Sequence, residues 1–228
     1  LGGKDAAYVA SDADPVAAAE SVVDGCMYNA GQSCCGIERV YVHADVYDAF
    51  LEHAKKLIAA YQLGDPTDAD TTMGPLADPG AADTMEDQVD QALAAGAEIA
   101  CGGQRTIIDG ATFFSPTLVL NPTADMAIMR EENFGPIMPV MKVHDDAEAL
   151  AHINDCDFGL TAALFTSSVE RAERLAAQIE AGTVYMNRCD YLDPALPWTG
   201  YKLSGRGSGL SRYAFYELTK RKSIHFKP

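Results

Sequence analysis

Hydrophobic and polar positions along this chain alternate between two spacings, one typical of amphipathic helices and the other of buried strands. Within residues 46–61, Phe50, Ala54 and Leu57 recur at helical spacing, whereas residues 38–43 have the short, β-branched and aromatic composition of a strand. Applied to the whole chain, these patterns predict helices over about 15–27, 46–61, 81–95, 146–153 and 169–179, and strands over about 38–43, 98–101, 113–120, 138–143, 161–166 and 183–187.

The order of these elements indicates the fold class. Strand–helix–strand spacing of this kind is typical of an α/β protein with a helix-covered, largely parallel sheet. Asp12 or Asp14 is expected to cap the first helix, and Pro116 to mark an edge or a bend of its strand. No repeat or low-complexity linker interrupts the chain. We therefore expect one domain, residues 1–210, and a C-terminal tail, residues 211–228, in which residues 222–227 form a strand.

Composition and charge narrow the range of functions. Among 228 residues, 48% are hydrophobic and 22% charged, as in globular proteins, and no apolar run approaches the ~18 residues of a membrane helix. No secretory signal is visible at the N-terminus. A net charge of −16 argues against a nucleic-acid partner, because phosphate binding needs clustered Lys and Arg. Six cysteines without zinc spacing predict no metal site and reduced thiols, as in the cytoplasm.

The most informative stretch is the run Tyr28-Asn29-Ala30-Gly31-Gln32-Ser33-Cys34-Cys35-Gly36. It places Cys34 after a Gly-Gln turn, between a helix-like segment and a strand-like one. A thiol at such a bend lies close to free backbone N–H groups. Those groups lower the pKa of a thiol or hold the oxyanion formed when it attacks a carbonyl. The alternative is that Cys34 is a small buried hydrophobic residue.

Four stretches, in order, resemble motifs of the aldehyde dehydrogenase superfamily. Leu1-Gly2-Gly3-Lys4 is similar to the segment after the family's general-base glutamate, and the cysteine run resembles its active-site segment. Glu131-Glu132-Asn133-Phe134-Gly135-Pro136 resembles the Glu-Glu-x-Phe-Gly-Pro loop, and the run from Leu196 to Gly207 resembles the Pro-Phe-Gly-Gly-x-Lys-x-Ser-Gly-x-Gly signature. The resemblance implies the family's catalytic-domain fold and a homo-oligomer, in which the C-terminal strand pairs with another subunit.

The resemblance also implies a chemistry. Cys34 corresponds to the nucleophile that converts an aldehyde to a carboxylic acid through a thiohemiacetal and a thioester. Glu132 corresponds to a residue that holds the ribose of NAD or NADP, Phe134 flanks the nicotinamide, and the Leu1 backbone contacts its carboxamide. The alternative for this loop is structural, with Glu131 and Glu132 in a short helix that Gly135-Pro136 ends.

Other positions carry over with less direct roles. Cys35 and Trp198 match residues of the substrate channel, although each is also suited to a packing role. Asn187 is expected to brace the cysteine loop, and Lys202 and Ser204 to be architectural. Thr199 replaces the first glycine of the Pro-Phe-Gly-Gly run, and Gly209 stands where many relatives carry a glutamate of a proton relay.

The chemistry that the family needs is not all visible between Leu1 and Pro228. In the family the general base directly precedes the Leu-Gly-Gly-Lys run, and the dinucleotide-binding domain and oxyanion asparagine lie mostly upstream. The glycine-rich run at 205–209 follows the last expected strand and does not read as a dinucleotide site. We therefore expect the chain alone to be inactive as a dehydrogenase.

Two rival functions stay open at the level of sequence. The first is a self-contained Cys–His hydrolase, for which His43 is the nearest of the five histidines to Cys34 in sequence. The second is a non-catalytic assembly module, in which the thiol of Cys34 is incidental.

Overall fold

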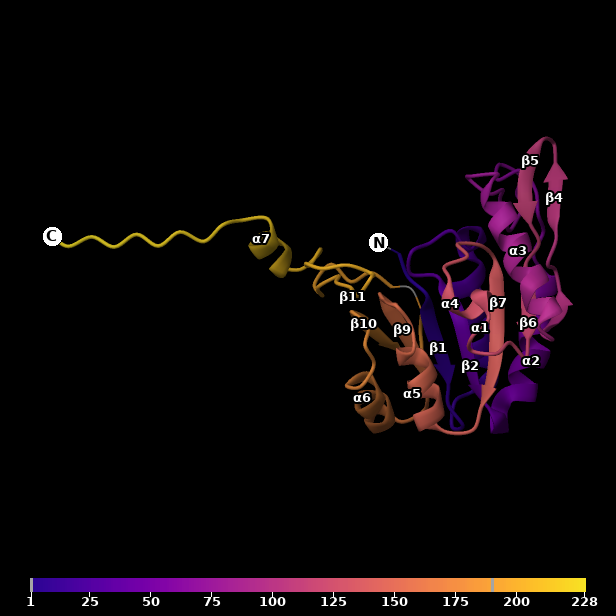
Figure 1. Cartoon of the computed structure of the whole chain (residues 1–228), viewed down its shortest axis with the longest axis horizontal. Coiled ribbons are helices and arrows are strands. Elements are labelled where there is room, and N and C mark those ends of the chain that lie inside the picture. The colour runs from indigo at the N-terminus through magenta and orange to yellow at the C-terminus, as the bar shows by residue number, and fades with distance from the viewer. Residues whose placement is uncertain (1, 190) are drawn as a thin grey trace.

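A seven-stranded sheet runs through the computed structural model, which describes residues 2–189 and 191–228 (Figure 1). Neighbouring strands are parallel, except that the edge strand β3 is antiparallel to β6. The strand order is β10 (Thr183–Met186), β9 (Thr161–Phe165), β1 (Asp5–Val9), β2 (Ile37–His43), β7 (Ile137–Val143), β6 (Thr117–Leu120) and β3 (Glu98–Cys101). The predicted largely parallel α/β sheet is confirmed.

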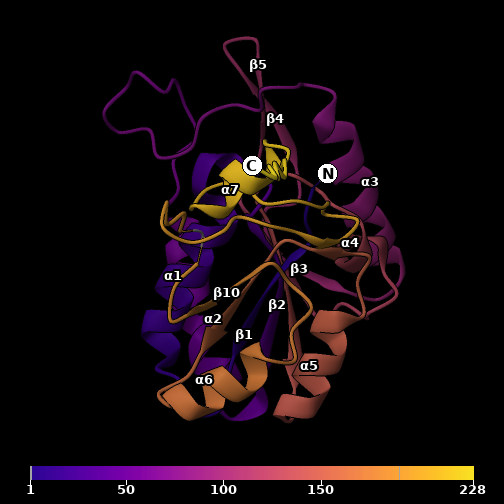
Figure 2. The ribbon, with the colours of Figure 1, turned by 90° about the vertical axis from the view of Figure 1, so that its left-hand side faces the viewer.

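Helices cover both faces of this sheet. Figure 2 shows α1 (Pro15–Met27) and α2 (Ala44–Ala59) on one side and α5 (Asp146–Asn154) on the other. The remaining longer helices are α3 (Ala81–Ala94), which packs on the one-turn helix α4 (Ala127–Arg130), and α6 (Val169–Ala176), which packs on β9. All five predicted helices are present. None of the helices in the described residues is long and apolar enough to cross a membrane.

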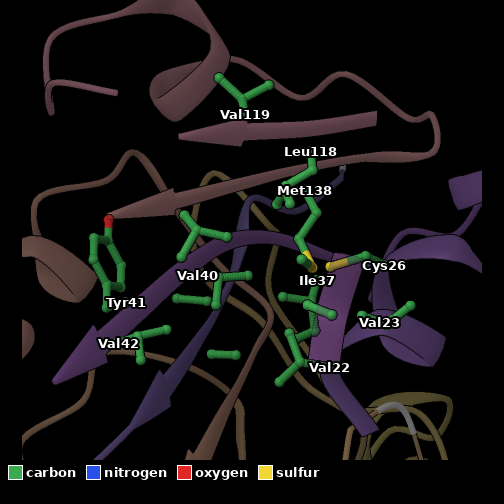
Figure 3. Packing of buried hydrophobic residues seen from close by; sticks show 14 of the residues in the cluster. Val22, Val23, Cys26, Ile37, Val40, Tyr41, Val42, Leu118, Val119 and Met138 are labelled. Carbon is green, nitrogen blue, oxygen red and sulfur yellow. The ribbon is translucent and has the colours of Figure 1, made fainter. Parts of the chain in front are cut away.

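Local sequence explains where α1 starts. The Asp14 carboxylate accepts hydrogen bonds from the backbone N–H groups of Val16 and Ala17, and Pro15 occupies the first helical position, where no donor is needed. Figure 3 shows the apolar face of the same helix, with Val22 and Cys26 beside the sheet. Asp14, the second of the two predicted caps, is therefore the one that the structure uses.

The strand β1 was not predicted from the sequence, although it lies in the middle of the sheet. Its residues Asp5-Ala6-Ala7-Tyr8-Val9 begin with an acidic residue and two alanines, which disfavour a strand interpretation. All five are buried, since strands on both sides and helices on both faces surround them. Asp5 obscures the strand in the sequence, because an acidic residue is expected at the surface and this one is buried.

The single strand predicted over residues 113–120 is wrong. Pro116 separates β5 (Ala111–Phe114) from β6, and the two belong to different sheets. With β4 (Arg105–Ile108), β5 forms an antiparallel hairpin that projects from the body (Figure 1). The turn consists of Asp109 and Gly110, both with positive φ, which is the preferred Asp-Gly geometry. That dipeptide was the signal in the sequence for the hairpin.

The C-terminal residues leave the body of the protein. A short antiparallel pair, β8 (Phe158–Gly159) with β11 (Tyr201–Lys202), precedes the one-turn helix α7 (Tyr213–Glu217), after which the chain extends away (Figure 1). Residues 222–227, predicted as a strand, make no strand pairing with the described residues of this chain. Pairing with a second copy stays a prediction.

Candidate active site

The candidate site lies at one edge of the sheet. Because β1, β2 and β7 are parallel, the residues that precede them gather at the amino-terminal edge, which is the upper edge in Figure 1. These residues are Gly2-Gly3-Lys4 before β1, the cysteine run before β2, and residues 131–136 before β7. The structure therefore brings together three of the four motif segments that the sequence singled out.

An unusual backbone path leads from α1 to the cysteine. After Met27 the residues Asn29, Ala30 and Gly31 have φ values of 51°, 55° and 71°. Three successive residues in the left-handed region reverse the chain sharply, and for Ala30 this conformation is strained. The reversal delivers Cys34 to a tight turn, in which the Gly36 N–H donates to the Ser33 carbonyl at 3.1 Å.

The two adjacent thiols of this turn differ in exposure. Cys34 is exposed, whereas Cys35 is buried, and its Sγ lies 3.4 Å from the Ser33 hydroxyl. The Ser33 hydroxyl also receives a short hydrogen bond from Tyr28. Since Cys34 stands at the tip of the turn, its thiol is the one that meets an incoming molecule.

Gly3 supports the cysteine turn from behind. A Cβ at Gly3 would lie 2.4 Å from the Cys34 carbonyl oxygen, so only glycine allows this approach. The Gly3 N–H donates to Oε1 of Glu132 at 3.1 Å. A Cβ at Gly2 would lie 2.6 Å from Oε2 of the same carboxylate. The Cys34 carbonyl and the Glu132 carboxylate therefore both pack against the glycine pair Gly2-Gly3.

Glu132 and Phe134 occupy a loop, not a helix. The helix α4 ends at Arg130, so the structural alternative in which Glu131 and Glu132 belong to a helix is wrong. Burial raises the pKa of the half-buried Glu132 carboxyl, while the hydrogen bond from Gly3 opposes this shift. Phe134 has a φ of 52°, a strained value for a bulky residue, and its side chain is 40% exposed.

A buried ion pair that the sequence analysis missed fixes this loop. Lys4 Nζ donates to Glu38 Oε2 at 2.8 Å, and the same carboxylate accepts from the N–H groups of Asn133 and Phe134, both at 2.9 Å. Burial lowers the pKa of Lys4, and the attraction of Glu38 opposes that change. Lys4 and Glu38 both lie in segments that the sequence analysis identified, but the sequence alone does not indicate that these two charges pair.

The last motif segment closes the back of the site. The Ser204 hydroxyl donates to the Gly2 carbonyl at 2.7 Å and accepts from the Gly159 N–H at 3.1 Å. Lys202 donates to the Asn154 carbonyl and pairs with Glu180, each at 2.7 Å. Ser204 and Lys202 thus make the internal contacts expected of architectural residues.

A second close approach joins the cysteine run to the loop before β7. A Cβ at Gly31 would lie 2.1 Å from the carbonyl carbon and oxygen of Gly135. On its other side Gly135 meets Met85 of α3, where an added Cβ would stand 2.3 Å from Cε. The cysteine run therefore packs backbone to backbone on the loop, and the Met85 side chain of α3 packs directly on Gly135.

Three of the predicted site residues are not placed beside the cysteine turn: two lie in other parts of the fold, and one falls outside the residues that the structure describes. Asn187 binds the backbone of Thr166: its amide oxygen accepts from the Thr166 N–H, and its amide nitrogen donates to the Thr166 carbonyl. It therefore braces the carboxyl end of β9, and the prediction that it braces the cysteine loop is wrong. Trp198 pairs its backbone with Gly209 and lines a groove beside β10. Leu1 falls outside the described residues.

The geometry does not support the Cys–His hydrolase. Cys34 precedes the seven-residue strand β2 and His43 ends it, so about 20 Å separates them at ~3.3 Å per residue. His43 accepts a hydrogen bond from the Asp45 N–H, and His152 stacks on Tyr41. Among the described residues, no hydrogen bond or ion pair joins a histidine to Cys34, and no three potential ligands gather as a metal site.

Comparison with known proteins agrees with this arrangement. The model of the aldehyde dehydrogenase family matches residues 1–224. Retinaldehyde dehydrogenase 3 of Mus musculus is 36% identical over 227 residues, covering 100% of this chain and 44% of the relative. Succinate-semialdehyde dehydrogenase [NADP(+)] 1 of Mycobacterium bovis is 39% identical, covering 98% and 49%.

A solved structure gives the same fold. Betaine aldehyde dehydrogenase from Staphylococcus aureus, in complex with NAD+, superposes with a TM-score of 0.91 at 34% identity, covering 95% of this chain and 44% of that one. The chain thus spans about half the length of the curated relatives it matches.

The contact between Gly31 and Gly135 gives a testable prediction. Gly31→Ala should destabilise the protein far more than Gly110→Ala, because both glycines have positive φ but only Gly31 faces backbone atoms. We expect a loss of about 1–2 kcal/mol for the Gly110 control, from the left-handed conformation alone, and a clearly larger loss for Gly31→Ala. Urea unfolding measures both. Equal losses would contradict the tight packing.

Proposed function

The chain belongs to the aldehyde dehydrogenase family, and we propose that it forms the cysteine-bearing, catalytic part of an NAD(P)-dependent enzyme that oxidises an aldehyde to a carboxylic acid. Because it spans about half the length of its curated relatives, this activity is proposed for the intact protein. The observation that carries the proposal is the arrangement on Gly3, where the Cys34 carbonyl and the Glu132 carboxylate are seated together beside an exposed thiol.

In the proposed reaction, the Cys34 thiolate attacks the carbonyl carbon and forms a C–S bond, which turns the carbonyl oxygen into an oxyanion. The backbone N–H of Cys34 stabilises this oxyanion, because the N–H groups of Ser33, Cys35 and Gly36 already donate within the turn. Gly3 and Gly31 hold the turn, so no change of structure is needed. NAD or NADP, when bound, supplies the two-electron acceptor for the hydride. The thioester left on Cys34 is then hydrolysed by water to release the acid and the thiol.

The residues present fit such a cofactor. Oε1 of Glu132 is taken by the Gly3 N–H, and no hydrogen bond to Oε2 is made by the described residues, so one carboxylate oxygen can accept from ribose hydroxyls. The Phe134 side chain is partly exposed, and its backbone is strained. This arrangement suits a residue whose ring edge limits where the nicotinamide ring can lie. The contribution of Leu1 rests on the resemblance alone.

The substrate channel of this proposal includes Cys35 and Trp198. Trp198 has the better support, since its half-buried ring borders a groove. The Cys35 thiol lies against Ser33 and contributes packing beside the nucleophile. A reducing compartment, the cytoplasm, suits an exposed nucleophilic thiol.

We propose further that residues 1–210 form the catalytic domain and residues 211–228 an oligomerisation tail. The support is the exposed apolar surface of that tail, which costs free energy in water unless it is covered. Its members are Tyr213, Phe215, Tyr216, Leu218, Ile224 and Phe226. A second copy of this chain is the occupant that fits, because an extended segment without internal pairing can add as a strand to a neighbour's sheet.

The role of Cys34 is tested in the intact protein. Cys34→Ser should lower aldehyde-dependent formation of NAD(P)H at least about a hundredfold, since a lost covalent nucleophile normally costs more than that, while cofactor affinity stays nearly unchanged. Cys101→Ser, on the edge strand β3, is the matched control and should be active. Activity of the Cys34 variant above about one per cent would exclude the assignment.

The role of Glu132 has its own control next to it in the sequence. Glu132→Gln should slow single-turnover reduction of the cofactor and leave KM for the aldehyde nearly unchanged, because a misplaced nicotinamide loses reacting geometry, not substrate binding. Glu131→Gln, an exposed neighbour, should behave like the unchanged protein. Equal single-turnover rates for the two variants would reject the ribose role.

Self-association is tested by sedimentation velocity in the micromolar range. The double variant Ile224→Lys with Phe226→Lys should shift the protein towards smaller species, because it places charge on the two most C-terminal apolar side chains of the tail. Val169→Lys changes an exposed apolar residue of α6, outside the tail, and should leave the distribution as it was. A protein that is monomeric before any substitution would refute the tail's role.

A further inference from the structure

Asp5 is a buried acid that the proposed chemistry does not use. It opens the central strand β1, is 2% exposed, and its Oδ2 accepts a hydrogen bond from the Thr161 hydroxyl of β9 at 2.6 Å. Burial, the largest influence, raises the pKa of Asp5 to about 8, against the hydrogen bonds from Thr161. An acid in this position calls for an explanation, because a buried carboxyl is costly unless it has a partner or a function.

The second oxygen of Asp5 faces the cysteine turn. Oδ1 lies 2.9 Å from the point where a Cβ of Gly3 would stand, and the Cys34 carbonyl oxygen lies 2.4 Å from the same point. The two oxygens therefore both lie against the bare Cα of Gly3, and the two distances, 2.4 and 2.9 Å, place them at most 5.3 Å apart. A carbonyl oxygen only accepts hydrogen bonds, so a protonated carboxyl is compatible with this arrangement and a carboxylate repels it.

The charged groups around Asp5 are already engaged. Lys4 is paired with Glu38, and the Arg39 guanidinium donates to the carbonyls of Lys4, His152 and Ile153. Glu180 shares with Asp5, Lys4 and Arg39 the lining of a small cavity on the other side. No ion pair joins a cation of the described residues to Asp5. Burial raises the pKa of Asp5 by more than the hydrogen bonds from Thr161 and the attraction of Arg39 lower it.

We propose that Asp5 is a positioning residue for Cys34. In its neutral form it supports the Cys34 carbonyl through Gly3, and its ionisation introduces a negative charge that displaces the cysteine turn and disfavours a thiolate there. This inference deepens the proposed function, on which its relevance to catalysis rests. Its physical content, a pH-dependent reactivity of one thiol, is measurable without any dehydrogenase activity.

The sign of the effect follows from the raised pKa. The pKa of an aspartate in an unfolded chain is about 4, below that of folded Asp5. The stabilisation by the neutral carboxyl is therefore complete below about pH 4, and it is lost as the pH rises through about 8. In the alkaline range Asp5 thus opposes the gain in Cys34 reactivity that deprotonation of the thiol would otherwise bring.

The experiment follows alkylation of Cys34 by iodoacetamide from pH 6 to 9.5, with peptide mapping by mass spectrometry and Cys101 as internal reference. Asp5→Asn keeps the shape and stays neutral. It should match the unchanged protein near pH 6 and react about three to ten times faster near pH 9, since a nearby like charge shifts a titration by up to about one unit. Asp14→Asn, an exposed helix cap that Asn also fills, should give the unchanged profile.

A second variant guards against misfolding of the first. Thr161→Val removes a hydrogen bond that favours the charged carboxyl, so the break in the alkylation profile should move to higher pH. Coincident profiles for the unchanged protein and Asp5→Asn, or an unmoved break in Thr161→Val, would overturn the inference. A pH-dependent gap in a protein without dehydrogenase activity would uphold the positioning role and count against the proposed function instead.

Discussion

The buried ion pair of Lys4 and Glu38 is the interaction on which the rest of the amino-terminal edge depends. Removing two charges from water is costly, and only complete hydrogen bonding makes the arrangement tolerable. Glu38 meets this condition by accepting from Lys4 and from two backbone N–H groups of the loop before β7. The pair therefore contributes geometry more than stability. It holds the segment before β1, the strand β2 and the loop before β7 in one arrangement, because any other arrangement leaves a charge unpaired.

Glycines transmit that geometry to the thiol. Gly3 lets the Cys34 carbonyl rest on the segment that carries Lys4, and Gly31 lets the cysteine run touch the backbone of Gly135. Contacts between backbones are stiffer than contacts between side chains, which have rotamers to change. The exposed Cys34 therefore stands on a rigid base, although the thiol itself contacts little, and this combination is what an attacking group needs.

Much of the fold could be predicted from the sequence, because long periodic segments such as α2 leave one helical face apolar. The strand β1 could not be predicted, because an aspartate is expected at the surface and Asp5 is buried. Its raised pKa favours the neutral form, and a sequence pattern carries no information on protonation. Motif resemblance indicated Cys34, Glu132 and the glycine pair, but not the partners of Lys4. The error on Asn187 has the same origin: its strand was right, while the direction of its side chain depended on β9.

The hydrogen bond from Ser204 to Gly2 spans 202 positions of the chain, and that from Gly3 to Glu132 spans 129. Such long-range contacts form late, because the entropy of closing large loops is lost before the contacts compensate for it. During synthesis on the ribosome, the cysteine turn has no completed backing until residue 204 has emerged. Between the synthesis of Cys34 and that of Ser204, the thiol is thus carried by a segment whose supporting contacts are incomplete.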